Sequence, residues 1–495
     1  MKYLSTRDAS LRKSAAEVIA QGLSRDGGLF TPEEFPKMPE GMLESLIPMS
    51  YQQRAVQVMK LYLEDFTEEE LREYASKAYA YGEKFDTQAV APVYHVTEGT
   101  EILELWHGPT CAFKDMALQM LPYLLTASLK KTGEEKTACI LVATSGDTGK
   151  AALEGFRDVD HTKILVFYPK DGVSDIQKRQ MVTQKGENVG VCSVIGNFDD
   201  AQTGVKKIFS DPEIREILAN RGQFLSSANS INWGRVLPQV VYYISAYCDL
   251  VRDGRISMGQ EINFCVPTGN FGDILAGFYA KTMGLPVKTL ICASNANNVL
   301  TDFIETGVYD RNRPFYTTDS PSMDILISSN LERLLYQLSG SDQEVQGYMN
   351  ALNETGRYEI SAELKAKIQE NFAASWCSDE AAGDNIAKLF GTEGYLMDTH
   401  TAVAYTVLEN YRKNTGDDTL SVVLSTASPY TFCSSVRTAM GISEMKPGTQ
   451  ILSQLEEKTR TTAPAPLKNL AGQAVRFTDE TEKEHMPDVV LEMLA

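Results

Sequence analysis

Short apolar runs alternate with helical patterns along the middle of the chain. Residues 138–142 (Ala-Cys-Ile-Leu-Val) form an unbroken apolar run, which is typical of a strand buried on both faces, and residues 163–168 (Lys-Ile-Leu-Val-Phe-Tyr) are the next expected strand. A helical pattern follows Gly149, and another covers 175–184 before a third strand at 189–195. Strands that alternate with helices in this way predict a parallel or mostly parallel sheet.

The same alternation returns in a second block. The expected strands there are 224–226, 262–266, 287–291 and 420–424, and the expected helices are 236–251 and 272–283. The pattern therefore predicts an α/β fold of two open, mostly parallel αβα blocks that flank a cleft, behind a mainly helical N-terminal domain. The expected domains are 1–95, a smaller αβ domain over 96–225, and a larger one over 226–495 with a helical insertion at about 340–395 and a C-terminal tail.

Composition excludes several classes of function. The net charge of −19, without a basic stripe, argues against a nucleic-acid partner. No apolar run approaches the roughly 20 residues that span a bilayer, and the N-terminus lacks a signal peptide, so we expect a cytoplasmic protein without a membrane partner. Eight dispersed cysteines without a Cys-x-x-Cys pair, and only five histidines, indicate neither a metal site nor a disulfide framework.

One lysine occupies a position that suits a residue forming an imine with an aldehyde. Lys114 ends the loop-like run 106–114, just before an apolar helical pattern. The positive end of a helix dipole disfavours the charge of such a lysine and favours the neutral amine that attacks an aldehyde. A solvated surface lysine fits the same position, so Lys114 alone does not decide the chemistry.

Two turns between a strand and a helix could bind anions. Residues 267–273 (Pro-Thr-Gly-Asn-Phe-Gly-Asp) follow a predicted strand, and their glycines would let backbone N–H groups approach a phosphate. Residues 144–149 (Thr-Ser-Gly-Asp-Thr-Gly) offer hydroxyls and amides that suit a carboxylate. A tight turn explains the first segment equally well, and a helix N-cap would be the better explanation of the second if it stood alone. Neither matches a dinucleotide fingerprint or a nucleotide P-loop, which disfavours a nucleotide-binding enzyme.

The motifs together resemble those of the threonine synthase family. They are 109–115 around Lys114, the turns 144–149 and 267–273, Ser-Ala-Asn-Ser-Ile-Asn-Trp-Gly-Arg at 227–235, and Gln-Gly-Leu-Ser-Arg-Asp-Gly-Gly-Leu-Phe-Thr-Pro at 21–32. Their order over most of the chain is similar to the longer branch of the family. The resemblance implies the tryptophan-synthase-β fold (fold type II) and pyridoxal 5′-phosphate as the cofactor, with a monomer or a homodimer as the assembly.

The resemblance also implies a role for each matching residue. Lys114 is expected to form the imine with the cofactor and then to move the α proton of the substrate. The cofactor is expected to contact Asp147 at its ring hydroxyl, Gly269, Asn270, Phe271, Gly272 and Asp273 at its phosphate, and Thr426 at its pyridine nitrogen. The substrate is expected to bind through Thr144, Ser145 and Thr148 at its carboxylate and through Asn229, Ser230 and Arg235 at its phosphate.

Some of these residues have a plain structural alternative. Arg235 also fits an exposed arginine at a helix start, and the Thr426 hydroxyl also fits a bond to its own backbone at a strand end. After Thr426 and Ala427 the family pattern is His-Pro-Ala-Lys, whereas this chain has Ser428-Pro429-Tyr430-Thr431. The departure puts a role for that histidine and lysine in doubt. His400, which is similar to a family residue, precedes a helix and fits a cap as well as catalysis.

The implied reaction converts O-phospho-L-homoserine and water to L-threonine and phosphate, the last step of threonine biosynthesis. It consists of a γ-elimination followed by hydration at the β carbon, which makes the protein a lyase. A same-fold dehydratase or a phospho-lyase that releases 2-oxobutyrate stays open, because the sequence does not show how long the unsaturated intermediate is held. A non-catalytic binding protein of this fold would not need Lys114, both anion turns and Arg235 together.

Overall fold

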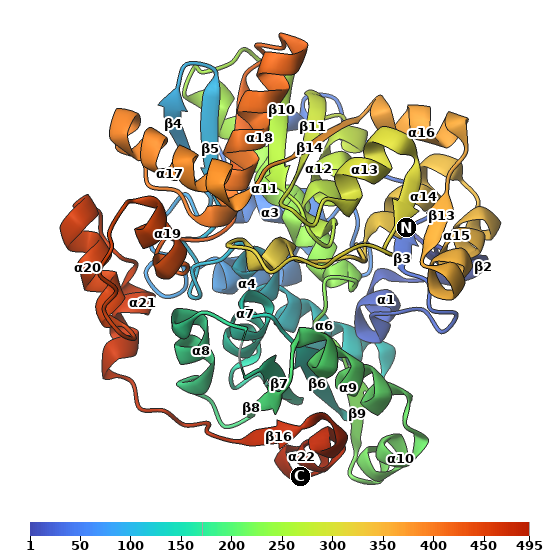
Figure 1. Cartoon of the computed structure of the whole chain (residues 1–495). Helices are drawn as coiled ribbons and strands as arrows, with labels where there is room; N and C mark the ends of the chain where they lie inside the picture. The colour runs from blue at the N-terminus through green and yellow to red at the C-terminus, as the bar shows by residue number, and fades with distance from the viewer. Residues whose placement is uncertain (171, 495) are drawn as a thin grey trace.

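Two separate sheets organise the computed structural model, which describes residues 1–170 and 172–494; the larger sheet lies above the smaller one in Figure 1. The larger sheet runs in the order β14 (Phe372–Trp376), β11 (Val287–Ser294), β10 (Ile262–Pro267), β15 (Ser421–Ser425), β5 (Thr100–Glu104) and β4 (Val93–Thr97). Neighbouring strands are parallel except for β4, which is antiparallel to β5.

All strands of the smaller sheet are parallel. Their order is β16 (Glu480–Glu482), β8 (Val189–Ile195), β7 (Thr162–Pro169), β6 (Thr137–Ala143) and β9 (Gln223–Ser226). The apolar runs read from the sequence are buried here on both faces, because helices cover both sides. The expected αβ architecture is thus confirmed, and the strand at 189–195 has the predicted bounds.

Helices cover both faces of each sheet. The smaller sheet packs against α7 (Asp147–Phe156), α9 (Phe198–Ser210), α10 (Pro212–Asn220) and α22 (Met486–Met493), and α7 contacts α8 (Asp175–Val182). The larger sheet packs against α12 (Gly272–Met283), α13 (Val299–Thr306), α16 (Ala362–Gln369) and α18 (Thr399–Thr415), and α18 contacts α17 (Asp379–Glu393). The long helix α11 (Trp233–Arg252) packs on α12 and on α5 (Asp115–Leu118) and α6 (Leu121–Thr132).

The N-terminal region combines a small sheet with four helices. Its elements are β1 (Tyr3–Ser5), β2 (Asp8–Lys13), α1 (Ala15–Gln21), β3 (Phe30–Pro32), α2 (Met42–Leu46), α3 (Tyr51–Met59) and α4 (Glu68–Ala78). Ser14, Ser50 and Thr67 begin three of these helices as capping boxes, each with a Glu or Gln three residues later. The region packs against α11 and α6, so its core is continuous with that of the two αβ blocks.

The remaining elements connect the blocks and form the C-terminal part. They are β12 (Val308–Asp310), η1 (Pro321–Met323), α14 (Leu331–Ser339), α15 (Asp342–Thr355), β13 (Arg357–Glu359), α19 (Cys433–Ala439), α20 (Gln450–Thr459), α21 (Ala465–Lys468), η2 (Asn469–Gly472) and η3 (Lys483–His485). From α21 the chain runs along the molecule to the smaller sheet, where β16 and α22 end it (Figure 1).

Two strands pair across the predicted domain limits, and a third strand lies in the expected helical insertion. β5 belongs to the larger sheet although it falls within 96–225, and β16 belongs to the smaller sheet although it falls within 226–495. The expected helical insertion also contains β14, the edge strand of the larger sheet. Backbone pairing with distant segments decides the sheet to which each of these strands belongs. The short sequences of the strands carry no apolar alternation that predicts this pairing. A division into three domains stays a prediction.

Both sheets have a topological switch point, where the chain changes the direction in which it adds strands. In the smaller sheet, β7 and β8 lie on one side of β6, and β9 lies on the other. In the larger sheet, β11 and β14 lie on one side of β10, and β15 lies on the other. Open parallel sheets bind ligands at the carboxyl ends of the strands beside such a point. The fold therefore directs attention to the segments after β6, β9, β10 and β15.

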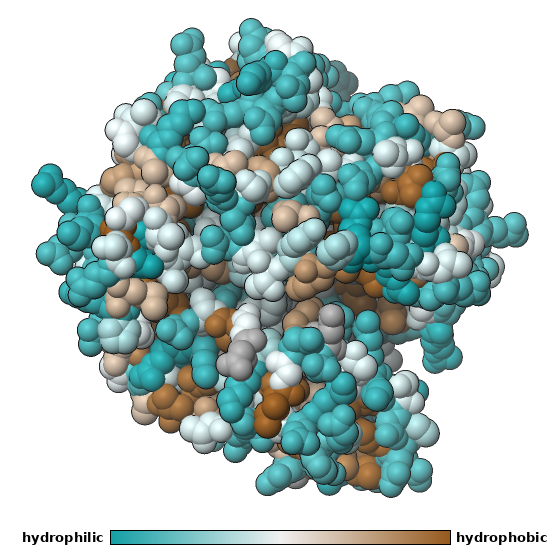
Figure 2. Space-filling model, in the orientation of Figure 1, coloured by the Kyte–Doolittle hydropathy of each residue, from teal (hydrophilic) through white to brown (hydrophobic). Residues whose placement is uncertain are grey.

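The surface in view is mainly hydrophilic. Figure 2 shows polar side chains over most of this face, with smaller separate hydrophobic areas between them. Within residues 1–170 and 172–494, none of the helices has the length and apolar character needed to span a bilayer. The described residues also contain no group of three or more His, Cys, Asp or Glu side chains placed to hold a metal ion.

Candidate active site

The four segments singled out in the sequence follow the four strands beside the switch points. The turn 144–149 follows β6, the 227–235 segment follows β9, the turn 267–273 begins at the end of β10, and Thr426 directly follows β15. The backbone N–H of Phe113 donates to the Thr426 carbonyl (2.8 Å), which places the Lys114 loop at the end of β15. The fold thus brings together motifs that are distant in sequence.

Lys114 occupies the position before α5, and its side chain is partly exposed. Its Nζ lies 5.7 Å from the centre of the Phe113 ring. Burial lowers the pKa of Lys114 to about 8, against the opposing effect of the Asp147 charge and with the help of the positive charges of Arg235 and Lys150. The amine is therefore neutral in a sizeable fraction of molecules near pH 7.5, as a nucleophile for an aldehyde requires.

Asp147 begins α7 and is almost fully buried. Gln177 Nε2 donates to its Oδ1 (2.8 Å), Ser322 Oγ donates to its Oδ2 (3.0 Å), and Lys150 Nζ lies 2.9 Å from Oδ1. Burial alone raises the pKa of Asp147, but the charges of Lys150 and Lys114 outweigh it and hold the pKa well below its usual range. The carboxylate is ionised at physiological pH.

Gly146 and Gly269 meet close neighbours that leave no room for a side chain. A Cβ on Gly269 would lie 2.8 Å from the Ser322 carbonyl oxygen, and a Cβ on Gly146 (φ +134°) would lie 2.5 Å from the Gln177 side chain. Phe271, in the same turn as Gly269, has φ +64°, which is rare outside glycine and orients successive amides unusually. Such a turn at the start of α12 suits a phosphate group.

The side chain of Asp273 has partners of its own. Its Oδ1 accepts hydrogen bonds from the Tyr242 hydroxyl (2.5 Å) and the Tyr243 hydroxyl (2.9 Å) of α11. Burial raises the pKa of Asp273 to about 6, although both tyrosines oppose the shift. A carboxylate does not attract phosphate, so the contribution of Asp273 to phosphate binding would come from its backbone N–H.

The three hydroxyls expected to bind the substrate carboxylate differ in whether they already have hydrogen-bond partners. Thr144 Oγ1 accepts hydrogen bonds from the N–H groups of Gly146 and Gly149 (both 2.9 Å), so it shapes the turn. Ser145 and Thr148 are partly exposed, and no described residue hydrogen-bonds either hydroxyl. Both remain available to a bound carboxylate.

Arg235, in the first turn of α11, is buried rather than exposed as a helix-start arginine would be. Its Nη1 donates to the Ala228 carbonyl (2.9 Å), while its Nε has no acceptor among the described residues. Asn229 is exposed, and the Ser230 hydroxyl lies 3.5 Å from that of Ser329. A buried guanidinium with an unmatched N–H fits an anionic group.

Thr426 is buried, and it lies beside the Lys114 loop through its carbonyl. Residues 428–431, which differ from the family pattern, also contact the Lys114 loop, because the N–H of Ser428 donates to the Cys111 carbonyl (3.1 Å). His400 Nδ1 lies 2.8 Å from Asp398 Oδ2, and His400 Nε2 accepts from the backbone N–H of Ser322 (3.2 Å). The N-cap of α18 is Asp398, so His400 is not the cap but a buried side chain that faces η1.

Two residues without a motif complete the arrangement. Ser322, in η1, contacts Asp147 through its hydroxyl, His400 through its N–H and Gly269 through its carbonyl. Lys150, on α7, is the buried ion-pair partner of Asp147. The sequence contains no periodic signal at Ser322, and Lys150 reads as an ordinary polar position of a helix; only its spacing of three from Asp147 suggests an ion pair.

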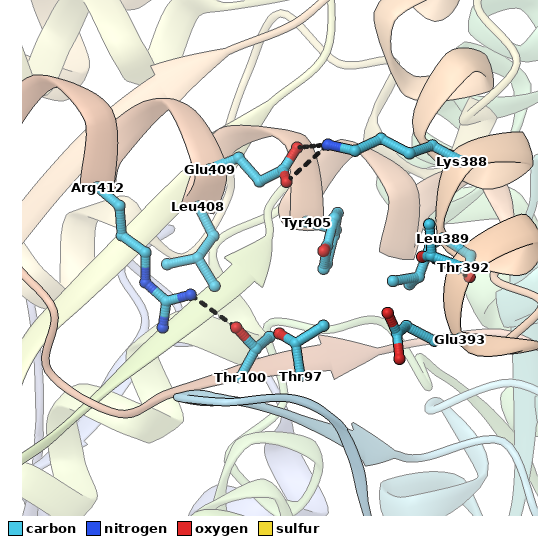
Figure 3. A pocket seen from close by; sticks show the side chains of 10 residues that line it. All are labelled: Thr97, Thr100, Lys388, Leu389, Thr392, Glu393, Tyr405, Leu408, Glu409 and Arg412. Carbon is cyan, nitrogen blue, oxygen red and sulfur yellow. Dashed lines mark hydrogen bonds and ion pairs between the residues drawn. The ribbon is translucent and has the colours of Figure 1, made fainter.

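A cavity of about 460 Å³ lies elsewhere, between α17, α18 and the β4–β5 hairpin. Figure 3 shows its charged side chains already engaged in part: Lys388 pairs with Glu409, and Arg412 donates to Thr100. Its lining includes none of the predicted site residues. It is therefore a separate feature from the Lys114 site.

Unmatched buried polar atoms test whether the site fits a cofactor. Lys150 Nζ and Arg235 Nε lack a hydrogen-bond partner within the described part of the chain, and the turn at 267–273 has glycines where neighbours approach closely. Buried polar groups are normally satisfied. The unsatisfied N–H groups of Lys150 and Arg235, together with the partly neutral amine of Lys114, fit an anionic aldehyde cofactor and an anionic substrate.

Comparison with known proteins decides the family. The family model "Pyridoxal-phosphate dependent enzyme" matches residues 102–427, "Threonine synthase N terminus" matches 2–79, and "Threonine synthase, C-terminal" matches 401–487. The chain belongs to the threonine synthase family. The expected family, the fold and the cofactor, pyridoxal 5′-phosphate, are confirmed; the roles of single residues remain predictions.

Individual relatives agree with this membership. The threonine synthase of Schizosaccharomyces pombe is 36% identical over 483 residues, covering 91% of this chain and 92% of that protein. The PLP-bound threonine synthase of Brucella melitensis has a similar structure, with a TM-score of 0.88, 35% identity and coverage of 100% and 99% of the two chains. Threonine synthase-like 1 of Homo sapiens is 42% identical over 463 residues, or 90% of this chain, but the chain spans only 61% of that relative's length.

Proposed function

We propose that this family member is a threonine synthase, which converts O-phospho-L-homoserine and water to L-threonine and phosphate in the cytoplasm, as a monomer or a homodimer. One observation supports the proposal: the turn 267–273 and the buried Arg235, each suited to a phosphate, lie after strands β10 and β9, and the Lys114 loop lies at the end of β15. An enzyme that binds a phosphorylated cofactor and a phosphorylated substrate needs both.

The residues of the chain divide the work in this proposal. Pyridoxal phosphate, when bound, supplies the electron sink for the negative charge left at the substrate α carbon. Lys114 accepts the α proton at Nζ, because its amine is neutral often enough near pH 7.5. Ser145 and Thr148 orient the substrate carboxylate, and Arg235 binds the phosphate that leaves from the γ carbon. Asp147 would contact the ring hydroxyl of the cofactor and so orient the ring.

Measuring three products from O-phospho-L-homoserine tests the proposal. We expect phosphate and threonine in equal amounts, with little 2-oxobutyrate. Phosphate with 2-oxobutyrate in place of threonine would instead assign the phospho-lyase reaction. A chain that binds the cofactor but releases no phosphate would overturn both and favour a binding protein.

Arg235→Ala is expected to weaken use of the phosphorylated substrate. A charge-assisted hydrogen bond contributes about 1.5–3 kcal/mol, so kcat/KM should fall about 10- to 150-fold, mainly through a higher KM. Arg235→Lys keeps the charge but loses the planar fork, and should retain part of the affinity. Steady-state kinetics and the melting temperature of both variants check this. Unchanged kinetics in Arg235→Ala would exclude the assigned role.

A further inference from the structure

Lys150 is an unusual residue for its position. It lies in the first turn of α7 among buried apolar residues, and its side chain is 1% exposed. Burial removes an ammonium from water, and the N-terminal end of a helix repels a positive charge. Folding alone would be served at least as well by an apolar side chain there. The retained charge therefore points to a role in the site that α7 borders.

The ion pair with Asp147 offsets part of the cost of burying the Lys150 charge, but it does not satisfy the hydrogen-bonding capacity of Nζ. Nζ lies 2.9 Å from Asp147 Oδ1, but no described residue offers it a well-aligned hydrogen bond. Asp147 already accepts hydrogen bonds from Gln177 and Ser322. What Lys150 adds is positive charge rather than a missing hydrogen-bond partner.

Charged groups on several elements bear on the pKa of Lys114 or lie next to it in the chain. Asp147 and Lys150 lie on α7, Arg235 lies on α11, and Asp115 follows Lys114 on α5, where Thr110 hydrogen-bonds it. His400 of α18 in turn faces Asp147. Asp147 favours the protonated form of Lys114, whereas Arg235 and Lys150 oppose it. Arg235 has an anion to bind in the proposed reaction, whereas the partner of Lys150 is Asp147, a residue of the protein itself.

We propose that Lys150 is a positioning residue of this site: its buried ammonium pairs with Asp147 (Nζ–Oδ1 2.9 Å) and so keeps that carboxylate from holding a proton on the Lys114 amine. The inference rests on the proposed role of Lys114 as the lysine that bonds the cofactor. It does not depend on which substrate is used.

Cofactor capture by the stripped full-length chain tests the role of Lys150. The growth of visible absorbance after mixing with pyridoxal phosphate is measured across pH, since capture needs the neutral amine. Lys150→Met should move the midpoint of the rate to higher pH by about half a unit or more, so that capture near pH 7.5 is about threefold slower. Lys150→Arg, which keeps the charge, should restore the wild-type midpoint.

Matched controls separate this effect from loss of structure and from failure of the proposed function. Lys388→Met removes an exposed lysine that pairs with Glu409 at the separate cavity, whose lining includes none of the predicted site residues, and should leave the midpoint unchanged. Melting temperatures identify variants that fail to fold, in which case Lys150→Gln replaces Lys150→Met. A midpoint that stays fixed or falls in a folded neutral variant would overturn the inference. Absence of capture by the wild-type chain would instead refute the role of Lys114 itself.

Discussion

Lys114→Ala is expected to remove the visible absorbance of the bound cofactor and to lower turnover by at least about a thousandfold. Two functions are lost together, because the same amine bonds the cofactor aldehyde and moves the α proton. The turn 267–273 remains intact in this variant, so the cofactor should still bind through its phosphate. Absorbance spectra, equilibrium dialysis with pyridoxal phosphate and phosphate release measure the three effects.

The contrast between lost chemistry and retained binding makes this test specific. A variant that loses both the absorbance and the dialysis signal would indicate that the site has collapsed, and its melting temperature would show this. Lys388→Ala, at the cavity remote from the site, is the matched control and should behave as wild type. Retained turnover in Lys114→Ala would exclude the assigned role, whatever its spectrum.

Sequence patterns locate most of the elements that hold the site. The helix at 272–283 has its predicted bounds, and the strand at 262–266 extends by one residue. These segments are predictable because apolar runs followed by glycine-containing turns report burial and turn chemistry at the same time. The turns 144–149 and 267–273 are visible for the same reason, since their glycines mark where the backbone approaches a neighbour.

Contacts between distant segments account for what the patterns miss. β16 (Glu-Thr-Glu) carries no strand signal, and it becomes a strand because β8 offers an edge to pair with. Ser322 lies in the short helix η1, and its position between Asp147 and His400 follows only from hydrogen bonds between distant segments. Lys150 is hidden for the opposite reason, because a lysine in a helical pattern normally predicts a solvated face.

Arg54→Leu is expected to be the most destabilising of the substitutions considered, although Arg54 lies outside the site. Arg54 of α3 is buried, and its Nη1 donates to Asp249 Oδ1 (2.7 Å) and Ser245 Oγ (2.8 Å) of α11. Its Nε and Nη2 donate to the carbonyls of Leu46 and Ile47 at the end of α2. Removing one partner of a buried ion pair costs about 3–5 kcal/mol. Arg252 Nη1 also donates to Asp249 Oδ1 (2.7 Å), so this carboxylate keeps one donor, and we expect about 3 kcal/mol, with a large share from the carbonyls that lose theirs.

The measurement is thermal unfolding, in which the melting temperature should fall by roughly 5 °C or more. Arg54→Leu combined with Asp249→Leu should be less destabilised than the sum of the two single variants, since Arg54 is then not left buried without its carboxylate and the half-exposed Arg252 keeps Asp253 as a partner. Arg72→Leu removes an exposed arginine that pairs with Glu68 on α4, and should change the melting temperature little. Because α11 also carries Arg235, equal stability of Arg54→Leu and wild type would mean that the polar contacts of Arg54 do not help to hold this helix in place.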